Sequence, residues 1–143
     1  MIDFKKVFLD TSIFIYLLED SQVYCDKVIN FIEHCIQHEI SFSTSTITHM
    51  EFCVRPYEIG RNDVIKDFEE LLVDLGITPQ PISLPVADTA AKLRAKYKGL
   101  RAMDALQLAT GIYSDCDAIL TNDKRIKEIE EIRIILIDDW NKF

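Results

Sequence analysis

Short apolar runs alternate along the chain with longer stretches in which apolar residues recur at helical spacing. The short runs, rich in β-branched and aromatic residues, predict strands at residues 5–10, 40–43, 117–121 and 134–137. The longer stretches predict helices at residues 13–18, 22–38, 62–75, 85–97 and 101–113, and one that starts at Ser45 or Thr48. Because strands and helices alternate, the pattern predicts an α/β fold with a mainly parallel sheet covered on both faces.

Residues with known roles at element ends support these boundaries. Thr11 and Ser12 are expected to cap the helix that begins at Ile13, because their hydroxyl groups accept hydrogen bonds from free N–H groups. Two prolines limit residues 77–82 to an edge or irregular strand. Since no repeat, low-complexity tract or Ser/Gly linker divides the chain, residues 1–143 are interpreted as one domain.

The composition is that of an ordinary globular protein, with 48% hydrophobic and 28% charged residues. The longest apolar run covers only residues 13–18, whereas a membrane span needs about 20 residues. The apolar stretch before Asp10 is also too short for a signal peptide. We therefore expect a cytoplasmic protein without a membrane partner. The cysteines match neither zinc-ligand spacing nor a small disulfide scaffold, so free buried thiols are the better interpretation.

Acidic residues occupy positions where parallel strands and the helices after them meet. Asp10 and Asp123 follow predicted strands, while Glu51 and Asp104 lie near the beginnings of predicted helices. Because the carboxyl ends of parallel strands share one edge of the sheet, these side chains are expected to converge there. Converging carboxylates repel one another unless a cation lies between them, and oxygen donors favour Mg²⁺ or Mn²⁺. The pattern therefore predicts a divalent-metal site suited to cleaving a phosphodiester.

Local structure offers an alternative explanation for each acid. Asp10 could cap a helix, and Glu51 could complete a capping box with Thr48. Asp104 could favour the positive end of a helix dipole, and Asp123 could belong to a turn. Taken singly, only Asp10 is better explained as a functional residue. Taken together, the order of the acids along the chain favours a shared site.

That order resembles the pattern of the PIN-domain family. The resemblance extends from about residue 7 to residue 137 and rests on short motifs: Leu9-Asp10-Thr11-Ser12, Ser45-x-x-Thr48-x-x-Glu51, Asp104-Ala105-Leu106-Gln107-Leu108-Ala109 and Leu120-Thr121-Asn122-Asp123. It implies a three-layer α/β/α sandwich and a ribonuclease that depends on Mg²⁺ or Mn²⁺, with one or two ions bound.

The resemblance also implies roles for individual residues. Asp10 and Asp104 would be the principal metal ligands, and Glu51 and Asp123 would complete the site directly or through water. Hydroxyl side chains would orient the site or the scissile phosphate, and these are Thr11, Ser12 and Thr121.

In length and motifs the chain resembles the toxin of a VapBC-type, type II toxin–antitoxin pair. That implies a cognate antitoxin, a segment of which blocks the active-site groove, and it is compatible with a homodimer. Two alternatives stay open, a housekeeping PIN nuclease and a non-catalytic PIN-fold binding module. An aspartyl-phosphate phosphohydrolase is disfavoured, because Ser12 stands where that chemistry usually needs a second Asp. The chain also lacks GxGxxG and GxxxxGK[ST] motifs, which disfavours nucleotide binding.

The net charge of −8 argues against nucleic-acid binding unless positive charge is concentrated locally. Two basic runs flank the proposed ligands, one between Asp88 and Asp104 and one directly after Asp123. We hypothesise that they form an RNA track, and the alternative is a solvated helix face. The residues concerned are Lys92, Arg94, Lys96, Lys98 and Arg101 in the first run and Lys124, Arg125 and Lys127 in the second.

Overall fold

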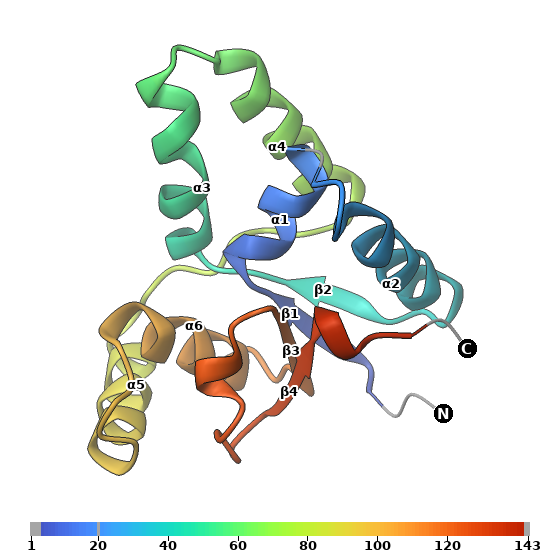
Figure 1. Cartoon of the computed structure of the whole chain (residues 1–143). Coiled ribbons are helices and arrows are strands. Elements are labelled where there is room, and N and C mark those ends of the chain that lie inside the picture. The colour runs from blue at the N-terminus through green and yellow to red at the C-terminus, as the bar shows by residue number, and fades with distance from the viewer. Residues whose placement is uncertain (1–3, 20, 142–143) are drawn as a thin grey trace.

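Parallel strands form the centre of the computed structural model, which describes residues 4–19 and 21–141 (Figure 1). The strands are β1 Lys6–Leu9, β2 Ser41–Ser43, β3 Ala118–Thr121 and β4 Arg133–Leu136. Their order across the sheet is β2-β1-β3-β4, so the first strand of the chain lies in the interior. Phe8 of β1 pairs with Ser43 of β2 on one side and with Ile119 of β3 on the other.

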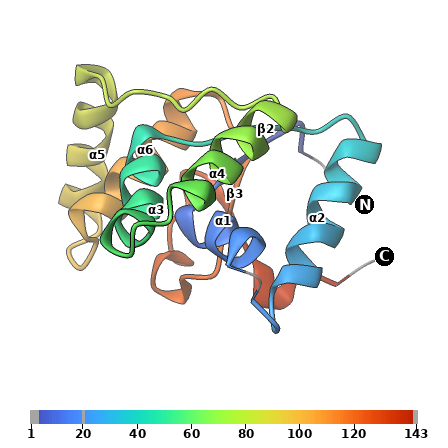
Figure 2. The same ribbon diagram turned by 90° about the horizontal axis from the view of Figure 1, so that it is seen from above.

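Helices cover both faces of this sheet, as the alternating pattern predicts (Figures 1 and 2). They are α1 Thr11–Leu18, α2 Cys25–Gln37, α3 Thr46–Glu58, α4 Asn62–Asp74, α5 Leu84–Lys96 and α6 Ala102–Tyr113, with 3₁₀ turns η1 Lys124–Ile126 and η2 Ile137–Asp139. Helices α1 to α4 pack on one face, and α5 and α6 pack on the other. Among the described residues, no helix combines the length and apolar character needed to cross a lipid bilayer.

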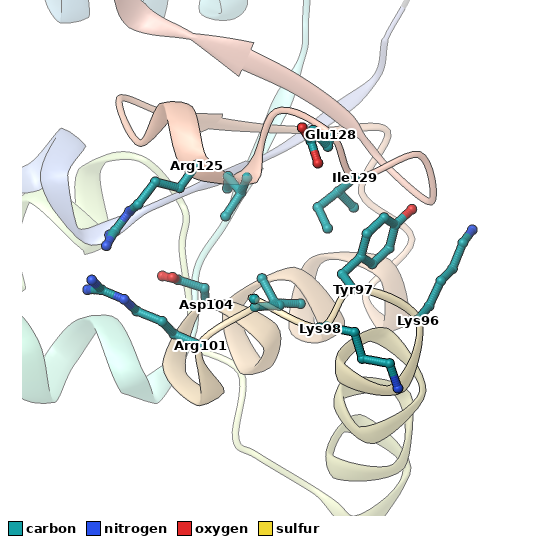
Figure 3. Close-up of a pocket in the computed structure, with 11 residues that line it drawn as sticks. Lys96, Tyr97, Lys98, Arg101, Asp104, Arg125, Glu128 and Ile129 are labelled. Atoms are coloured by element: carbon teal, nitrogen blue, oxygen red, sulfur yellow. The ribbon is translucent and has the colours of Figure 1, made fainter.

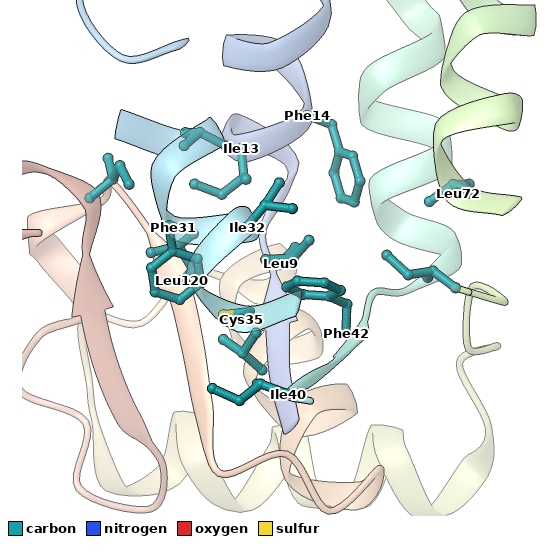
Figure 4. Close-up of a cluster of buried hydrophobic side chains, with 14 of the residues drawn as sticks. Leu9, Ile13, Phe14, Phe31, Ile32, Cys35, Ile40, Phe42, Leu72 and Leu120 are labelled. Atoms are coloured by element: carbon teal, nitrogen blue, oxygen red, sulfur yellow. The ribbon is translucent and has the colours of Figure 1, made fainter. Parts of the chain in front are cut away.

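Successive residues of the central strands point to opposite faces and so build two cores. Val7 and Leu9 are buried with α1 to α4, whereas Phe8 between them is buried with α5 and α6. In β3, Leu120 faces the first core and Ile119 the second. Figure 4 shows the first core, in which Leu9 and Leu120 meet side chains from α1 and α2. The predicted three-layer α/β/α sandwich is confirmed.

The cap of α1 differs from the sequence prediction. Thr11 and Ser12 were expected to cap this helix, but both lie inside it. Asp10 is the cap, with extended backbone angles (φ −71°, ψ 160°) and a carboxylate oxygen that accepts the Thr11 N–H at 2.8 Å. The reason is that β1 ends at Leu9, which leaves the next residue extended and free to cap.

Residues 77–82 form an irregular segment beside the start of α3. The N–H of Gln80 donates to the carbonyl of Thr44, and its own carbonyl accepts from the N–H of Thr46, both at 2.9 Å. The prolines on either side of Gln80 have no N–H to donate, so the pairing of this segment is limited to a single bridge. The prediction of an irregular strand is confirmed, and the bridge holds the beginning of α3 at the carboxyl edge of the sheet.

Candidate active site

The carboxyl ends of β1 and β3 meet at one edge and bring two of the predicted acids together. Asp10 follows β1 directly, and its N–H donates to the carbonyl of Leu120 in β3 at 3.1 Å. Thr121 ends β3, and Asp123 lies two residues later as the cap of η1. The edge that the parallel topology predicts therefore carries these side chains.

Hydrogen bonds fix the carboxylate of Asp10 at this edge. One oxygen accepts from the N–H of Thr11 at 2.8 Å, and the other accepts from the hydroxyl of Thr121 at 2.8 Å. The hydroxyl of Ser12 lies 3.5 Å from the same second oxygen. Thr11 and Thr121, both predicted as supporting residues, thus contact Asp10 directly, and Ser12 lies beside it.

Burial raises the pKa of Asp10, because an ionised carboxylate loses hydration in the interior. The hydrogen bonds from Thr121 and Thr11 oppose this shift, since they stabilise the charged form. The neighbouring charges of Glu51 and Asp123 raise the pKa further. Asp10 is therefore a desolvated carboxylate that the negative charges of Glu51 and Asp123 repel.

Asp104 lies in the first turn of α6 and belongs to the same group of acids. Burial is the main cause that raises its pKa, and the charges of Asp123 and Asp10 raise it as well. Arg125 and Arg101 act in the opposite direction. Asp10 and Asp104 thus each interact with Asp123, although they come from elements far apart in the chain.

Glu51 reaches the site from α3 through a threonine. The Thr11 hydroxyl donates to a Glu51 carboxylate oxygen at 2.8 Å. This contact joins the first turn of α1 to α3 and gives Glu51 a partner other than the capping-box partner Thr48 considered from the sequence. One residue, Thr11, therefore contacts two of the predicted acids, Asp10 through its N–H and Glu51 through its hydroxyl.

Asp123 forms an ion pair with Arg125. Arg125 donates to its two carboxylate oxygens through Nε at 2.9 Å and Nη2 at 2.7 Å, and its backbone N–H adds a contact at 3.0 Å. The hydrogen bond from Arg125 is the main cause that lowers the pKa of Asp123. The Asp123 N–H in turn donates to the Thr121 hydroxyl at 3.1 Å.

A buried network of hydroxyl and amide groups lies behind these acids, and sequence reasoning missed it. Gln107 of α6 donates to Thr48 at 2.8 Å and to Thr11 at 3.4 Å, and it accepts from Ser45. Ser45 and Thr48 were considered only as residues that start or cap a helix, and Gln107 stood in its motif without a role. One signal was available, because Gln107 lies one helical turn after Asp104 and therefore on the same side of α6 as this predicted ligand.

A pocket of about 350 Å³ opens beside Asp104, between the turn that joins α5 to α6 and the turn η1 (Figure 3). Figure 3 shows Asp104 between the side chains of Arg101 and Arg125. Apart from Asp104 and a second acid, Glu128, the residues that line the pocket are mainly apolar or basic: Lys96, Tyr97, Lys98, Gly99, Leu100, Arg101, Arg125, Ile126 and Ile129. The pocket therefore combines an apolar wall with cations next to a predicted ligand.

Four residues of the first basic run are the main candidates for contact with RNA, and they occupy different places: Lys92, Arg94, Lys96 and Arg101. Lys96 and Arg101 line the pocket. Lys92 lies 3.4 Å from a carboxylate of its own helix, and Arg94 donates through Nε to a backbone carbonyl of the α5–α6 turn at 3.1 Å. Arg94 thus shapes the turn that carries Arg101, while Lys92 lies further along the exposed face of α5.

The order of strands, helices and acids matches one protein family. The family model for the PIN domain matches residues 7–132. The chain belongs to the PIN domain family. The resemblance predicted from the motifs is confirmed over nearly the same stretch.

Solved structures share the fold of this PIN domain. VapBC2 from Rickettsia felis, bound to a promoter DNA fragment, gives a TM-score of 0.73 at 18% identity, covering 92% of this chain and 98% of that chain. FitAcB from Neisseria gonorrhoeae gives 0.69 at 18% identity, with coverage of 94% and 99%. A toxin–antitoxin complex from Klebsiella pneumoniae gives 0.66 at 21% identity, with coverage of 92% and 97%. No curated protein sequence matches this chain significantly.

The donor chemistry of this PIN domain fits a hard divalent cation. The site is built from carboxylate oxygens, and a cation would relieve the burial and repulsion that raise the pKa of Asp10 and Asp104. Within the described part of the chain, no three His, Cys, Asp or Glu side chains are already arranged to hold an ion. Glu51 is held by a threonine and Asp123 by an arginine, so these two carboxylates would have to change partners.

Proposed function

We propose that the protein is a cytoplasmic ribonuclease that depends on Mg²⁺ or Mn²⁺, folded as one domain over residues 1–143. The observation that carries this proposal is the raised pKa of two carboxylates, Asp10 and Asp104, which lie in the field of Asp123 at one edge of the sheet. Carboxylates that are desolvated and repel one another are typical of functional sites, where a cation or a proton balances them.

Asp10 and Asp104 would hold the ion, and Glu51 and Asp123 would complete the ligand set for one or two ions. A bound divalent cation would supply Lewis acidity, which lowers the pKa of water and stabilises negative charge on phosphate. The protein's own contribution is to fix the donors. Thr121 holds one oxygen of Asp10 in place through its hydroxyl.

RNA would reach these acids across the pocket beside Asp104. Arg101 and Lys96 line that pocket and would contact phosphate oxygens, while Lys92 and Arg94 lie further along α5. The apolar lining suits a nucleotide base, which carries a flat, weakly hydrated face. The local positive charge supports RNA binding by a chain that is acidic overall.

Cleavage of a short labelled RNA by purified protein tests the enzymatic proposal. We expect cleavage with Mn²⁺, none in excess EDTA, and recovery when Mn²⁺ is restored. Asp10→Asn and Asp104→Asn should be folded and inactive. Asp88→Asn is the matched control, because Asp88 is an acid on the exposed face of α5. Full activity of both site variants, or equal activity in EDTA, would refute the proposed mechanism.

We further propose that the protein is the toxin of a toxin–antitoxin pair. Support comes from the similar solved structures, which include a toxin–antitoxin complex from Klebsiella pneumoniae and VapBC2 from Rickettsia felis. An exposed apolar stripe on α3 also favours a protein partner, an antitoxin or a second copy. Met50, Val54 and Tyr57 lie four and three positions apart on this helix, and each is about half exposed or more.

Expression of the protein alone tests the toxin role. We expect growth arrest with the wild type and normal growth with Asp104→Asn. An active nuclease that leaves growth unaffected would instead be a housekeeping PIN nuclease. A folded protein that binds RNA or a partner but cleaves nothing would be a non-catalytic PIN-fold module.

A further inference from the structure

Gln107 is a buried amide on the side of α6 that carries Asp104, one helical turn earlier. The residue is 3% exposed, and Thr110, one turn later, is fully buried. A buried amide is unfavourable unless its donors and acceptor are paired. All of its partners are polar side chains of α1 and the start of α3. Gln107 therefore joins α6, which carries Asp104, to the elements that carry the other acids.

Ser45 determines which way this amide points. Its hydroxyl oxygen accepts from the N–H groups of Ile47 at 3.1 Å and Thr48 at 3.4 Å, as the cap of α3. Because these contacts use the oxygen as an acceptor, its single proton is free to donate to the amide oxygen of Gln107. The NH₂ group of Gln107 must then face the opposite side, toward Thr48 and Thr11.

The direction of the amide sets the direction of the next hydrogen bond. Thr11 accepts from Gln107 at 3.4 Å, so its own proton is available for a carboxylate. The Thr11 hydroxyl lies 3.3 Å from the Thr48 hydroxyl and 2.8 Å from a Glu51 carboxylate oxygen, and its single proton goes to the nearer, charged acceptor, Glu51. Hydrogen bonds thus run in one direction from Ser45 through Gln107 and Thr11 to Glu51. We call these four residues the relay.

We propose that Gln107 is a positioning residue of the site, which aims the Thr11 hydroxyl at Glu51 and thereby fixes the Glu51 carboxylate beside Asp10. The inference rests on the proposed nuclease function for its kinetic consequence, but not for its geometry. Gln107 is buried and reaches the acids only through hydroxyl groups: it donates to Thr11 at 3.4 Å and to Thr48 at 2.8 Å, and these two hydroxyls lie 3.3 Å apart. Its loss should therefore lower the rate of the chemical step without weakening RNA binding.

Steady-state kinetics with a short labelled RNA test this role. Gln107→Met keeps the length of the side chain but removes both donors, and Thr11→Val removes the hydroxyl. We expect each to lower kcat between about tenfold and a hundredfold, with KM within about twofold of the wild type. Thr11→Ser should restore activity, because it keeps the hydroxyl.

Two further variants separate the relay from general damage. Thr110→Val is the matched control, because Thr110 is a buried hydroxyl of the same helix that donates to the carbonyl of Leu106 at 2.7 Å, outside the relay. It should leave kcat unchanged. In the double variant Thr11→Val/Gln107→Met, kcat should be no lower than in Thr11→Val alone. Multiplicative losses would overturn the proposal, since the two residues would then act independently.

A spectroscopic measurement distinguishes failure of the relay from failure of the proposed function. In metal-free protein with ¹³C-labelled glutamate, the side-chain carboxyl resonance of Glu51 should shift in Gln107→Met and Thr11→Val, but not in Thr110→Val. Absence of cleavage by the wild type would refute only the nuclease, because this resonance still reports the relay. An unmoved resonance in folded Gln107→Met would overturn the relay itself. If Gln107→Met does not fold, Gln107→Leu, which also lacks both donors, is measured by the same resonance, and an unmoved Glu51 resonance in that variant would overturn the relay.

Discussion

Arg125 holds Asp123 in a fork, with two guanidinium nitrogens at 2.9 and 2.7 Å from the two carboxylate oxygens. The pair is partly open to solvent, with side-chain exposures of 56% for Arg125 and 21% for Asp123. Ion pairs of this exposure contribute little to stability, because solvent screens the two charges. The fork is therefore weak enough to be exchanged for a divalent cation at small cost.

Removal of this fork should strengthen metal binding. Because Arg125 competes for Asp123, we expect Arg125→Gln to lower the Mn²⁺ dissociation constant by up to about fivefold. Isothermal titration of metal-free protein without RNA measures this. Arg101→Gln is the matched control, because it removes a nearby cation that lines the same pocket. An equal effect of both variants would mean that only overall charge matters.

The positions of the acids and the hydroxyl-bearing residues around Asp10 were predictable, but the partners of Glu51 and Asp123 were not. Periodicity located the strands, and the rule for parallel sheets then placed Asp10 and Asp123 at one edge. The capping role of Asp10 depended on where β1 ends, which sequence patterns fix only to within a few residues. The choice of Arg125 as partner of Asp123 depends on side-chain conformation, which no pattern of residue types encodes.

The relay was hidden for a different reason. Hydrophobic periodicity assigns the packed face of the helix to Ala105, Leu108, Ala109 and Ile112. Gln107 lies on the other side of the helix, to which this pattern gives no role. Its partners Ser45 and Thr48 lie about 60 residues earlier and become neighbours only when α3 packs against α6. Pairings at such a separation belong to tertiary structure, and a single sequence carries no direct signal for them.

Neutralising Asp104 should stabilise the metal-free protein. Its pKa is raised mainly by burial and then by Asp123 and Asp10, so the folded state disfavours its charge. A group with a raised folded-state pKa contributes its full stability below its unfolded pKa, near 4, and loses it as the pH rises through the folded value. Because Asp104 is only half-buried, we expect Asp104→Asn to gain less than about 1 kcal/mol, or under about 4 °C in Tm.

Thermal melts in EDTA at pH 4 and pH 7 measure this effect. The difference in Tm between Asp104→Asn and the wild type should be larger at pH 7, where the aspartate is ionised. A difference that shrinks at pH 7 would contradict the assigned direction of the pKa shift. The same variant should be inactive. The ionised carboxylate of Asp104 would then lower the stability of the metal-free fold while being required for activity.

Buried thiols should make the fold sensitive to alkaline pH. Burial raises the pKa of Cys35 to about 12 and that of Cys116 to about 11. At pH 8 neither thiol forms appreciable thiolate in the folded state, so a thiol reagent should modify them only after unfolding. Their contribution to stability is complete below the unfolded pKa, near 8.5, and is lost as the pH rises toward 11 and 12.

Reaction with a chromogenic disulfide reagent at pH 8, with and without denaturant, measures the protection. A Cys25→Ser/Cys53→Ser background leaves Cys35 and Cys116 as the two remaining thiols of the chain. Denaturant titrations at pH 7 and pH 10 should show a lower unfolding free energy at pH 10. Rapid modification of both thiols in the native protein would show that the helices around them open readily.

Thr121 should act as the support of Asp10 through its hydroxyl group. The side chain is fully buried, donates to Asp10 at 2.8 Å and accepts from the N–H of Asp123 at 3.1 Å. Thr121→Val keeps the shape but leaves both partners unpaired, which costs about 1–3 kcal/mol for a buried group. We expect weaker Mn²⁺ binding by about tenfold and a matching loss of activity, because one oxygen of Asp10 loses its fixed orientation. Thr121→Ser should retain both, whereas equal effects of Val and Ser would assign the loss to packing around the methyl group.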